Sequence, residues 1–489
     1  MQVVWLKRDL RVRDHAPLVE AARRGPVVVL YVYEPRLWKE PEYDACHLNF
    51  VNESLAALDA ALGPLGARVT YRCGPILSVL RDLSQALAAH GGISALRSHV
   101  EVGSAWTYGR DRAVHRWAKA QGVVWHEYGQ DGVSRPHPSR DGWASRWTSE
   151  MAAPLYPVPK RVGGVDTVVP GWDHQRVRTP ADLHMAPSTA TTVQRGGLDE
   201  AEAVLLSFYR RRSQGYRSAM SSPLSAWDGC SRLSPYLAWG CVSTRDVWMR
   251  TRLKQRALRG RRDGKDWFDD LDAFESRLRW RGHFMQKLED QPGLAVVNQA
   301  STVDGLREGR FHQGHFEAWC EGRTGLPLVD ACMRSLRAER WLNFRMRAML
   351  MSVSSYTLWN HWREPALHLA RYFLDFEPGI HFPQVQMQSG TTGINSVRIY
   401  DPFKQARDHD PTGAFVRRWV PELADVSDAW IFEPHTKPGG IAGYPAPIVD
   451  VVHANRRART TLESLRRTDE ARAESQRIQR RHGSRKRRR

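Results

Sequence analysis

The chain has 489 residues, 42% of them hydrophobic and 26% charged, and a formal net charge of +19 at pH 7. This length exceeds what a single hydrophobic core normally holds, so two or three domains are expected. No apolar run is long enough to cross a bilayer, no signal-peptide pattern follows Met1, and the six cysteines include no CxxC pair. These features argue against a membrane span and a cysteine-metal or disulfide framework. They predict a cytoplasmic protein without a metal site, associated with the nucleoid if the cell is bacterial.

Short β-branched runs alternate with helical segments over residues 1–135. The predicted strands are Gln2–Trp5, Pro26–Tyr33, Ala67–Tyr71, Ile93–Arg97 and Val123–Glu127, and the predicted helices are Leu48–Leu62, Ser78–His90 and Arg110–Gln121. Buried parallel strands are continuous apolar runs, and strands that alternate with helices form doubly wound sheets. We therefore expect an N-terminal α/β domain with a parallel sheet.

Eight prolines interrupt residues 136–198 and break any long helix or strand there. A segment of this length without secondary structure is unusual unless it packs on its neighbours. It is therefore predicted to be an ordered linker that runs over the surface between two domains.

From residue 199 to 455 the apolar residues recur with helical spacing, and no strand pattern interrupts them. Helices are predicted over Glu200–Arg212, Pro235–Gly240, Thr244–Arg256, Trp267–Leu288, Leu328–Arg337, Trp341–Trp359 and Glu364–Leu374. The second domain is therefore expected to be all-α.

Residues 456–489 form a basic tail that carries +10 of the net charge. Its composition predicts a flexible extension, with a fraying helix over Arg456–Arg481 as its only regular structure. Two interpretations stay open, which are contact with a nucleic-acid backbone through counterion release and a solubilising segment without a partner. The terminal RRHGSRKRRR also has the composition of a nuclear-import signal.

Eight segments in a fixed order carry the strongest functional signal. They are VVWLKRDLRVRDH (Val3–His15), GCSRLSPYLAWG (Gly229–Gly240), RLRWRGHF (Arg277–Phe284), TGLPLVDACMR (Thr324–Arg334), RWLNFRMRAML (Arg340–Leu350), FLDFEPGIHFPQVQMQ (Phe373–Gln388), RIYDPFKQ (Arg398–Gln405) and FVRRWVPEL (Phe415–Leu423). Their order and spacing resemble the photolyase/cryptochrome family of FAD-binding blue-light proteins. The resemblance implies that the helical domain buries FAD, and that the α/β domain is a place for a second, antenna pigment of the folate or deazaflavin type.

The GCSRLS segment offers a place for the two phosphates of FAD. The hydroxyls of Ser231 and Ser234, the Arg232 guanidinium and the backbone amides around Leu233 would bind an anion at the start of a helix. The plainer interpretation is a helix N-cap beside a surface arginine. By resemblance, Tyr216 also lies against the phosphate end of the cofactor.

The resemblance assigns further residues to the isoalloxazine ring. Arg281 faces the flavin, and Glu377 contacts its pyrimidine edge. Arg347 and Asp375 form a salt bridge beside the ring, where a buried carboxylate must be paired. His381 takes the position that faces flavin N5. It either donates a hydrogen bond to N5 or turns away and is satisfied by a backbone carbonyl.

The cavity for a damaged base differs from that of typical relatives. Trp280 is retained and would stack on a base, which is worth about 1–3 kcal/mol. Arg277, Phe344, Ala348 and Met387 replace the residues that are usual there, so the chain matches neither standard lesion pocket of the family. Arg277 is expected to contact a DNA phosphate and Phe344 to stack on a base.

The three tryptophans that reduce the flavin in many relatives are also altered. Only the middle one is kept, as Trp362, whereas Val385 and Gly309 occupy the other two positions. Trp359, one helical turn before Trp362, is a candidate for an alternative electron-transfer route.

The resemblance implies a monomeric photolyase that repairs UV-induced pyrimidine dimers in duplex or single-stranded DNA, by light-driven electron transfer from reduced FAD. Residues 101–112 (EVGSAWTYGRDR) are a candidate lining for the antenna pigment, and an empty domain is the alternative. His15 stands where relatives usually have Asn. Two rival functions stay open: a cryptochrome-type photoreceptor without repair activity, and a basic nucleotide-binding protein without flavin.

Overall fold

The computed structural model describes residues 1–135, 140–163, 176–261 and 264–483. The N-terminal part contains five parallel strands, β1 (Gln2–Leu6), β2 (Val27–Tyr33), β3 (Val69–Cys73), β4 (Ala95–His99) and β5 (Val124–Tyr128), in the order β3-β2-β1-β4-β5. The three central strands are buried along their whole length. All five predicted strands are found, and the continuous apolar runs of the central strands are typical of strands covered on both faces, whereas the edge strands β3 and β5 are partly exposed.

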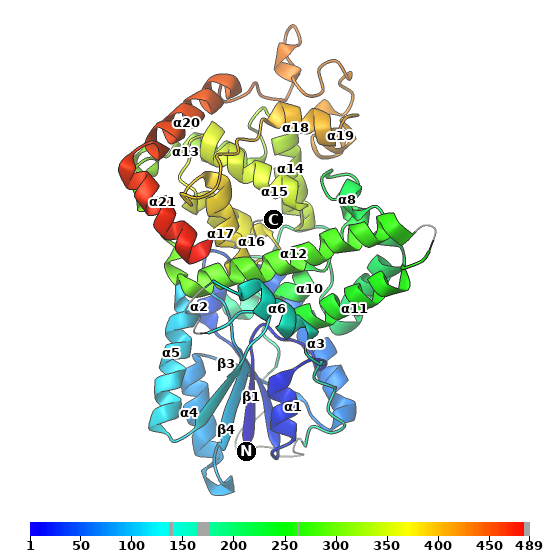
Figure 1. Ribbon diagram of the computed structural model, residues 1–489, viewed down its shortest axis with the longest axis vertical. Helices are drawn as coiled ribbons and strands as arrows, with labels where there is room; N and C mark the ends of the chain where they lie inside the picture. The colour runs from blue at the N-terminus through cyan, green and yellow to red at the C-terminus, as the bar shows by residue number, and fades with distance from the viewer. Residues whose placement is uncertain (136–139, 164–175, 262–263, 484–489) are drawn as a thin grey trace.

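Helices cover both faces of this sheet (Figure 1). They are α1 (Ala16–Ala22), α3 (Ala45–Leu62), α4 (Ile76–Ala86) and α5 (Ala105–Ala120), with the short α2 (Pro35–Trp38) at one end. Helices α1 and α3 share a core with Val4 of β1, whereas α4 and α5 share one with Val3. Neighbouring residues of a strand point to opposite faces, so the domain is the doubly wound unit that the sequence predicts.

The second part of the chain is helical. Its helices are α7 (Leu198–Ser207), α8 (Tyr216–Ala219), α9 (Ala226–Gly229), α10 (Ser234–Ala238), α11 (Thr244–Ala257), α12 (Gly264–Asp290), α13 (Gln313–Glu321), α14 (Pro327–Glu339), α15 (Phe344–Ser352), α16 (Arg363–Tyr372), α17 (Pro378–Ser389), α18 (Pro402–His409) and α19 (Ala414–Trp419). Helix α17 packs against α12, α15 and α16. Within the described ranges, no helix is long and apolar enough to cross a bilayer.

The linker contains one helix that the sequence analysis missed. Residues Trp143–Ala152 form α6, which packs against α11 and α12. Its buried residues Trp143, Trp147 and Met151 are spaced four residues apart and therefore share one helix face. The irregular structure predicted around α6 is otherwise found in the described residues 153–163 and 176–197, apart from a single 3-10 turn at Ala181–Leu183.

Residues 456–483 do not form the flexible extension predicted from composition, but the helix predicted over Arg456–Arg481 is found, divided into two. Two helices occupy this region, α20 (Val451–Arg466) and α21 (Asp469–His482), and α20 crosses the predicted domain boundary. Ala458 and Leu462 of α20 are buried against Trp359 of the helical domain. An apolar stripe at helical spacing therefore outweighs the basic composition. The last six residues of the candidate nuclear-import signal lie outside the described residues.

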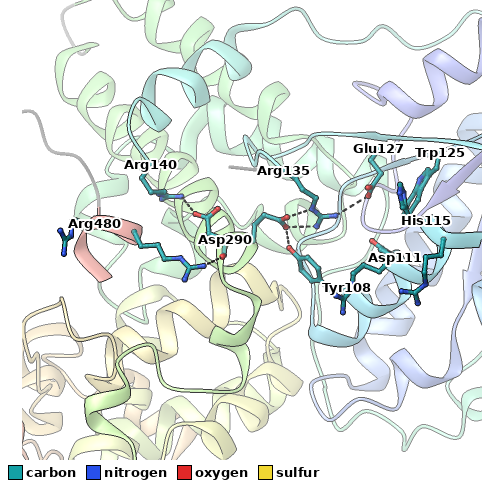
Figure 2. Close-up of a pocket in the computed structure, with 13 residues that line it drawn as sticks. Tyr108, Asp111, His115, Trp125, Glu127, Arg135, Arg140, Asp290 and Arg480 are labelled. Atoms are coloured by element: carbon teal, nitrogen blue, oxygen red, sulfur yellow. Dashed lines mark hydrogen bonds and ion pairs between the residues drawn. The ribbon is translucent and has the colours of Figure 1, made fainter. Parts of the chain in front are cut away.

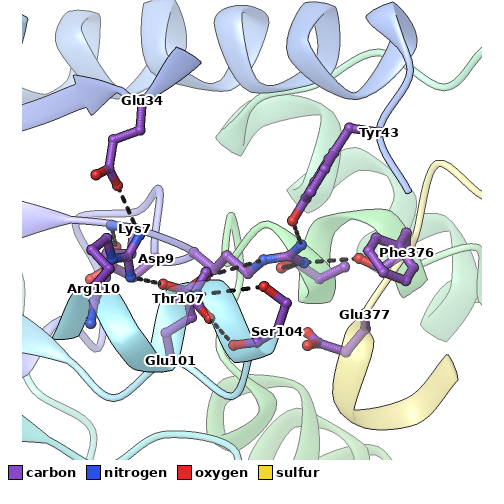
Figure 3. A network of polar contacts seen from close by, with 12 residues as sticks. Lys7, Asp9, Glu34, Tyr43, Glu101, Ser104, Thr107, Arg110, Phe376 and Glu377 are labelled. Carbon is purple, nitrogen blue, oxygen red and sulfur yellow. Dashed lines mark hydrogen bonds and ion pairs between the residues drawn. The ribbon is translucent and has the colours of Figure 1, made fainter. Parts of the chain in front are cut away.

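A polar junction attaches the helical domain to the carboxyl ends of the strands. Arg8, just after β1, donates to the carbonyl of Phe376 at 2.9 Å, and its guanidinium lies 4.3 Å from the centroid of the Trp239 ring. The network drawn in Figure 3 extends from Glu101 in the α/β domain to Phe376 in the helical domain. Gly240 permits this contact: its φ is +70°, and a Cβ there would lie 2.3 Å from the Arg8 carbonyl oxygen.

Candidate functional site

Arg347 of α15 and Asp375, between α16 and α17, form a bidentate ion pair. Nη1 and Nη2 of Arg347 lie 2.9 Å and 2.8 Å from Oδ1 and Oδ2 of Asp375. Burial acts to raise the pKa of Asp375, but the Arg347 guanidinium and the Ser234 hydroxyl outweigh it and hold that pKa below its usual value. The carboxylate is therefore charged and held in one position, as expected of an acid beside a flavin.

Arg232 is a buried cation that lies between two indole rings. Its Cζ is 3.7 Å from the centroid of Trp227 and 3.9 Å from that of Trp341. Its Nη1 is buried without a hydrogen-bond partner among the described residues, and burial lowers the Arg232 pKa to about 10. Only 7% of the residue is exposed, so the alternative of a surface arginine is wrong. A buried cation with an unused N–H fits an anionic group such as a diphosphate.

The other residues predicted for the phosphate end already have protein partners. The Ser231 hydroxyl accepts from the Leu233 N–H at 3.4 Å, and the Ser234 hydroxyl bonds to the carboxylate of the ion pair described above. Tyr216, which opens α8, is buried, and its hydroxyl bonds to Arg277. The arginine between the indoles differs from these neutral hydroxyls because its unused N–H carries a positive charge, which favours an anion.

Arg281 of α12 bridges the two domains. Its Nη2 lies 3.0 Å from Oε2 of Glu377, and its Nε lies 3.3 Å from Oδ1 of Asp131, which follows β5. Burial is the largest influence on Glu377 and raises its pKa, since Arg281 and Arg8 offset that influence only in part. Sequence reasoning missed Asp131 because no motif marks it. The predicted roles of Arg281 and Glu377 toward a flavin stay predictions.

His381 of α17 is turned toward the protein interior. Its Nε2 lies 2.9 Å from the carbonyl oxygen of Ala366 and therefore carries the ring proton that bonds to it. Burial lowers the His381 pKa to about 4, so the ring is neutral at physiological pH. The alternative of a histidine satisfied by a backbone carbonyl is the one found. A donated bond to N5 would require the second ring nitrogen, which holds no proton in this tautomer.

Three neighbouring helices present the residues predicted to contact DNA. Trp280 on α12 is 44% exposed and Phe344 on α15 is 49% exposed, whereas Met387 on the intervening α17 is partly buried. Arg277 is exposed one helical turn before Trp280, on the same side of α12. The Trp280 ring stacks on Phe284, with centroids 5.5 Å apart, and keeps part of its surface exposed, so this region is a candidate for stacking on bases.

Comparison with known proteins identifies the family. Residues 2–138 match the family described as DNA photolyase, and residues 274–464 match the FAD binding domain of DNA photolyase. A deoxyribodipyrimidine photo-lyase of Streptomyces griseus is 31% identical over 475 residues, which cover 93% of this chain and 97% of the relative. This chain belongs to the DNA photolyase family.

Other similarities cover the same length. A cryptochrome DASH of Gloeobacter violaceus is 27% identical, over 92% of this chain and 93% of that protein. The crystal structure of a class III photolyase from Agrobacterium tumefaciens superposes with a TM-score of 0.78 at 24% identity, covering 96% of this chain and 98% of that one. The photolyase fold predicted from the sequence is therefore confirmed, and FAD is the cofactor that the matched helical domain binds.

The tryptophans considered for electron transfer in this photolyase-family chain have different surroundings. Trp362 is fully buried, and its Nε1 donates to Asn298 at 2.7 Å. Trp359 has a φ of +58°, and the buried Arg307 guanidinium lies 4.7 Å from the centroid of its ring. A ring that gives up an electron becomes positively charged, which a cation at this distance opposes. The contact therefore disfavours Trp359 as an electron donor.

A cleft between the two domains is the candidate place for an antenna pigment (Figure 2). Its volume is about 890 Å³, and Tyr108, Asp111 and Arg112 of the predicted segment line it. Trp125 of β5 and Arg480 of α21 also line it. Arginines beside aromatic rings suit a planar, negatively charged molecule. That a pigment binds here stays a prediction.

His15, the residue that departs from the family pattern in the first segment, belongs to a buried cluster with Asp9 and His99. The Leu18 N–H donates to Nδ1 of His15 at 3.0 Å, so the ring proton lies on Nε2, 3.1 Å from Oδ2 of Asp9. Nδ1 of His99 lies 2.7 Å from the same oxygen. Asp9 is thus held by a hydrogen bond from His99 and by the close approach of His15, and the cluster is buried.

Proposed function

We propose that this protein uses blue light to repair UV-induced pyrimidine dimers in DNA. The observation that carries the proposal concerns two exposed aromatic rings, which lie on helices whose buried residues are those predicted to contact FAD. On α12, exposed Trp280 directly precedes buried Arg281, and on α15, exposed Phe344 lies one turn before Arg347. These rings would therefore hold a base close to the interior where the cofactor binds. FAD, when bound, absorbs the light and supplies the electron.

The chain's own residues would hold the cofactor and orient the substrate. Arg232 would bind the diphosphate through its unused N–H, and Asp375 with Arg347 would set a fixed charge beside the ring. Taking a base out of a duplex costs a few kcal/mol, and stacking on Trp280 and Phe344 returns about 1–3 kcal/mol for each base. We propose that duplex and single-stranded lesions both bind.

We further propose that the protein acts as a monomer. Among the residues that the structure describes, the most exposed large aromatic side chains are Trp280 and Phe344, which are assigned here to DNA. The net charge of +19 makes two copies repel each other. A sedimentation experiment in buffer of physiological salt should give a mass close to 55.8 kDa for the protein part.

Repair is tested directly with chemically reduced protein and DNA that contains one defined lesion. One substrate carries a cyclobutane dimer and the other a (6-4) photoproduct, and each is incubated in blue light and in the dark. Loss of at least one lesion in light alone is the expected result. If both lesions stay intact under light while FAD is bound and reduced, the repair function is rejected.

A light sensor on the same fold is the second candidate function. The observation that favours it is the unusual cavity, in which Phe344, Ala348 and Met387 replace the typical residues of the family. A sensor would bind FAD and respond to light without consuming the lesion. Light-induced spectral change together with intact lesions in the repair assay would support this candidate over repair.

A further inference from the structure

The C-terminal arm, defined here as α20 and α21 (Val451–His482), is fixed to the helical domain by a carboxylate clasp. Glu474 of α21 is 8% exposed. Its Oε1 accepts from the N–H and hydroxyl of Ser301 at 2.8 Å and 2.7 Å, and its Oε2 accepts from those of Thr302 at 3.0 Å and 2.7 Å. Burial opposes the charge, but these four donors hold the pKa of Glu474 below its usual value. The arm therefore has a defined position.

The outward face of the arm is strongly basic. Residues 456–483 contain nine arginines and four acids, and one of those acids is the buried clasp residue. The exposed arginines are Arg456, Arg457, Arg459, Arg467, Arg472, Arg477, Arg480 and Arg481. Arg459 lies 3.9 Å from Glu463 and Arg472 lies 3.2 Å from Asp469, and exposed ion pairs of this kind contribute little. A rigid, positively charged surface of this kind fits a regular polyanion.

The arm ends beside the helix that carries the exposed tryptophan. Arg481 donates to the carbonyl of Asp290 at 2.6 Å, and Nε2 of His482 lies 2.8 Å from the Gln291 side chain, where α12 ends. Figure 1 shows α21, in red, reaching that end of α12. Trp280 lies ten residues before Asp290, which corresponds to about 15 Å along a helix. A duplex advances by about 3.4 Å per base pair, so this distance corresponds to about four to five base pairs.

We propose that the arm is a DNA-binding surface that contacts the phosphates of the duplex beside the lesion. The inference rests on the proposed function, since it places the lesion at Trp280. A duplex seated there and running along α12 toward its C-terminal end brings its backbone to Arg477 and Arg480. Each phosphate contact releases counterions and adds about 0.9 to the slope of log affinity against log salt. The arm thus adds affinity without reading sequence.

The test compares two double variants that each remove two positive charges. Arg477→Ala/Arg480→Ala alters the arm, and Arg23→Ala/Arg24→Ala removes two exposed arginines of the α/β domain as a control. Binding is measured by fluorescence anisotropy between 50 and 200 mM salt, with a labelled duplex containing one cyclobutane dimer and with the undamaged duplex. The arm variant is expected to bind both duplexes about tenfold more weakly or worse, with a salt slope smaller by about 2. The control variant should behave almost as the wild type.

A third variant tests the position of the arm rather than its charge. Glu474→Ala removes the clasp and keeps every arginine, and it is expected to weaken DNA binding while FAD content and far-UV circular dichroism stay unchanged. An unchanged salt slope in the arm variant, an equal loss in the control variant, or unchanged binding by Glu474→Ala would each overturn the proposal. Repair by the wild type is scored separately under light. If the protein binds DNA normally but repairs no lesion, the enzyme function is rejected, whereas the proposal that the arm binds DNA still stands.

Discussion

Replacing Asp375 by Asn removes one charge from a buried ion pair and leaves its shape almost unchanged. The carboxylate is 4% exposed and makes two bonds to Arg347, whose side chain is 22% exposed. Breaking a fully buried pair costs about 3–5 kcal/mol, because the remaining charge is left uncompensated. Since Arg347 keeps some contact with water and Asn keeps one acceptor, we expect Asp375→Asn to lower the free energy of unfolding by about 2–3 kcal/mol. FAD retention should fall with it.

A second ion pair in the same chain supplies the control. Arg334 and Glu422 are also joined by two bonds, at 2.7 Å and 3.0 Å, and the Arg334 side chain is likewise 22% exposed. Glu422 is 29% exposed, so Glu422→Gln should cost about 1 kcal/mol or less and leave FAD bound. Urea unfolding and the flavin absorbance that survives gel filtration measure both effects. Equal unfolding midpoints and equal FAD content for Asp375→Asn and the wild type would refute the role of this pair.

Three further predictions follow from single side chains. Trp280→Ala should lower the affinity for dimer-containing DNA by about 1–3 kcal/mol and leave FAD bound, and equal affinities in a filter-binding assay would assign Trp280 to structure alone. The stability that neutral His381 contributes is complete above pH 6.5 and is lost as the pH falls toward about 4. His381→Asn should therefore lose less stability than the wild type on acidification, whereas parallel urea-midpoint curves would contradict a neutral ring. Gly240→Ala places a methyl group against the Arg8 carbonyl and should destabilise the protein by about 2–3 kcal/mol. An unchanged midpoint of thermal unfolding would contradict this prediction.

Strands and helices with an uninterrupted pattern of apolar residues could be predicted from the sequence. Elements were harder to predict where prolines or arginines nearby obscured that pattern. The run Val27–Tyr33 is apolar throughout because β2 is covered on both faces, so periodicity alone identifies it. Helix α6 was hidden by the prolines around it, although Trp143, Trp147 and Met151 already show the four-residue spacing of a buried helix face. The helix over α21 was predictable, but its arginines concealed that Ile478 is buried and fixes the helix to the rest of the chain.

The ion pair of Arg347 and Asp375 was found because both residues lie in recognisable segments. The contacts that cross the domain junction were beyond sequence reasoning. Asp131 meets Arg281 across 150 positions of the chain, and no local spacing indicates such a pair. The sequence likewise permits two orientations of His381, because the Ala366 carbonyl that decides between them belongs to another helix.

The contacts of Arg8 with Phe376 and of Asp131 with Arg281 mean that neither half of the molecule is an independent part. In a chimaera that joins the α/β half of one relative to the helical half of another, charged residues at the domain junction would face neighbours that do not match them. Attempts to transplant the FAD-binding half should keep Arg8 and Asp131 in the α/β half that receives it.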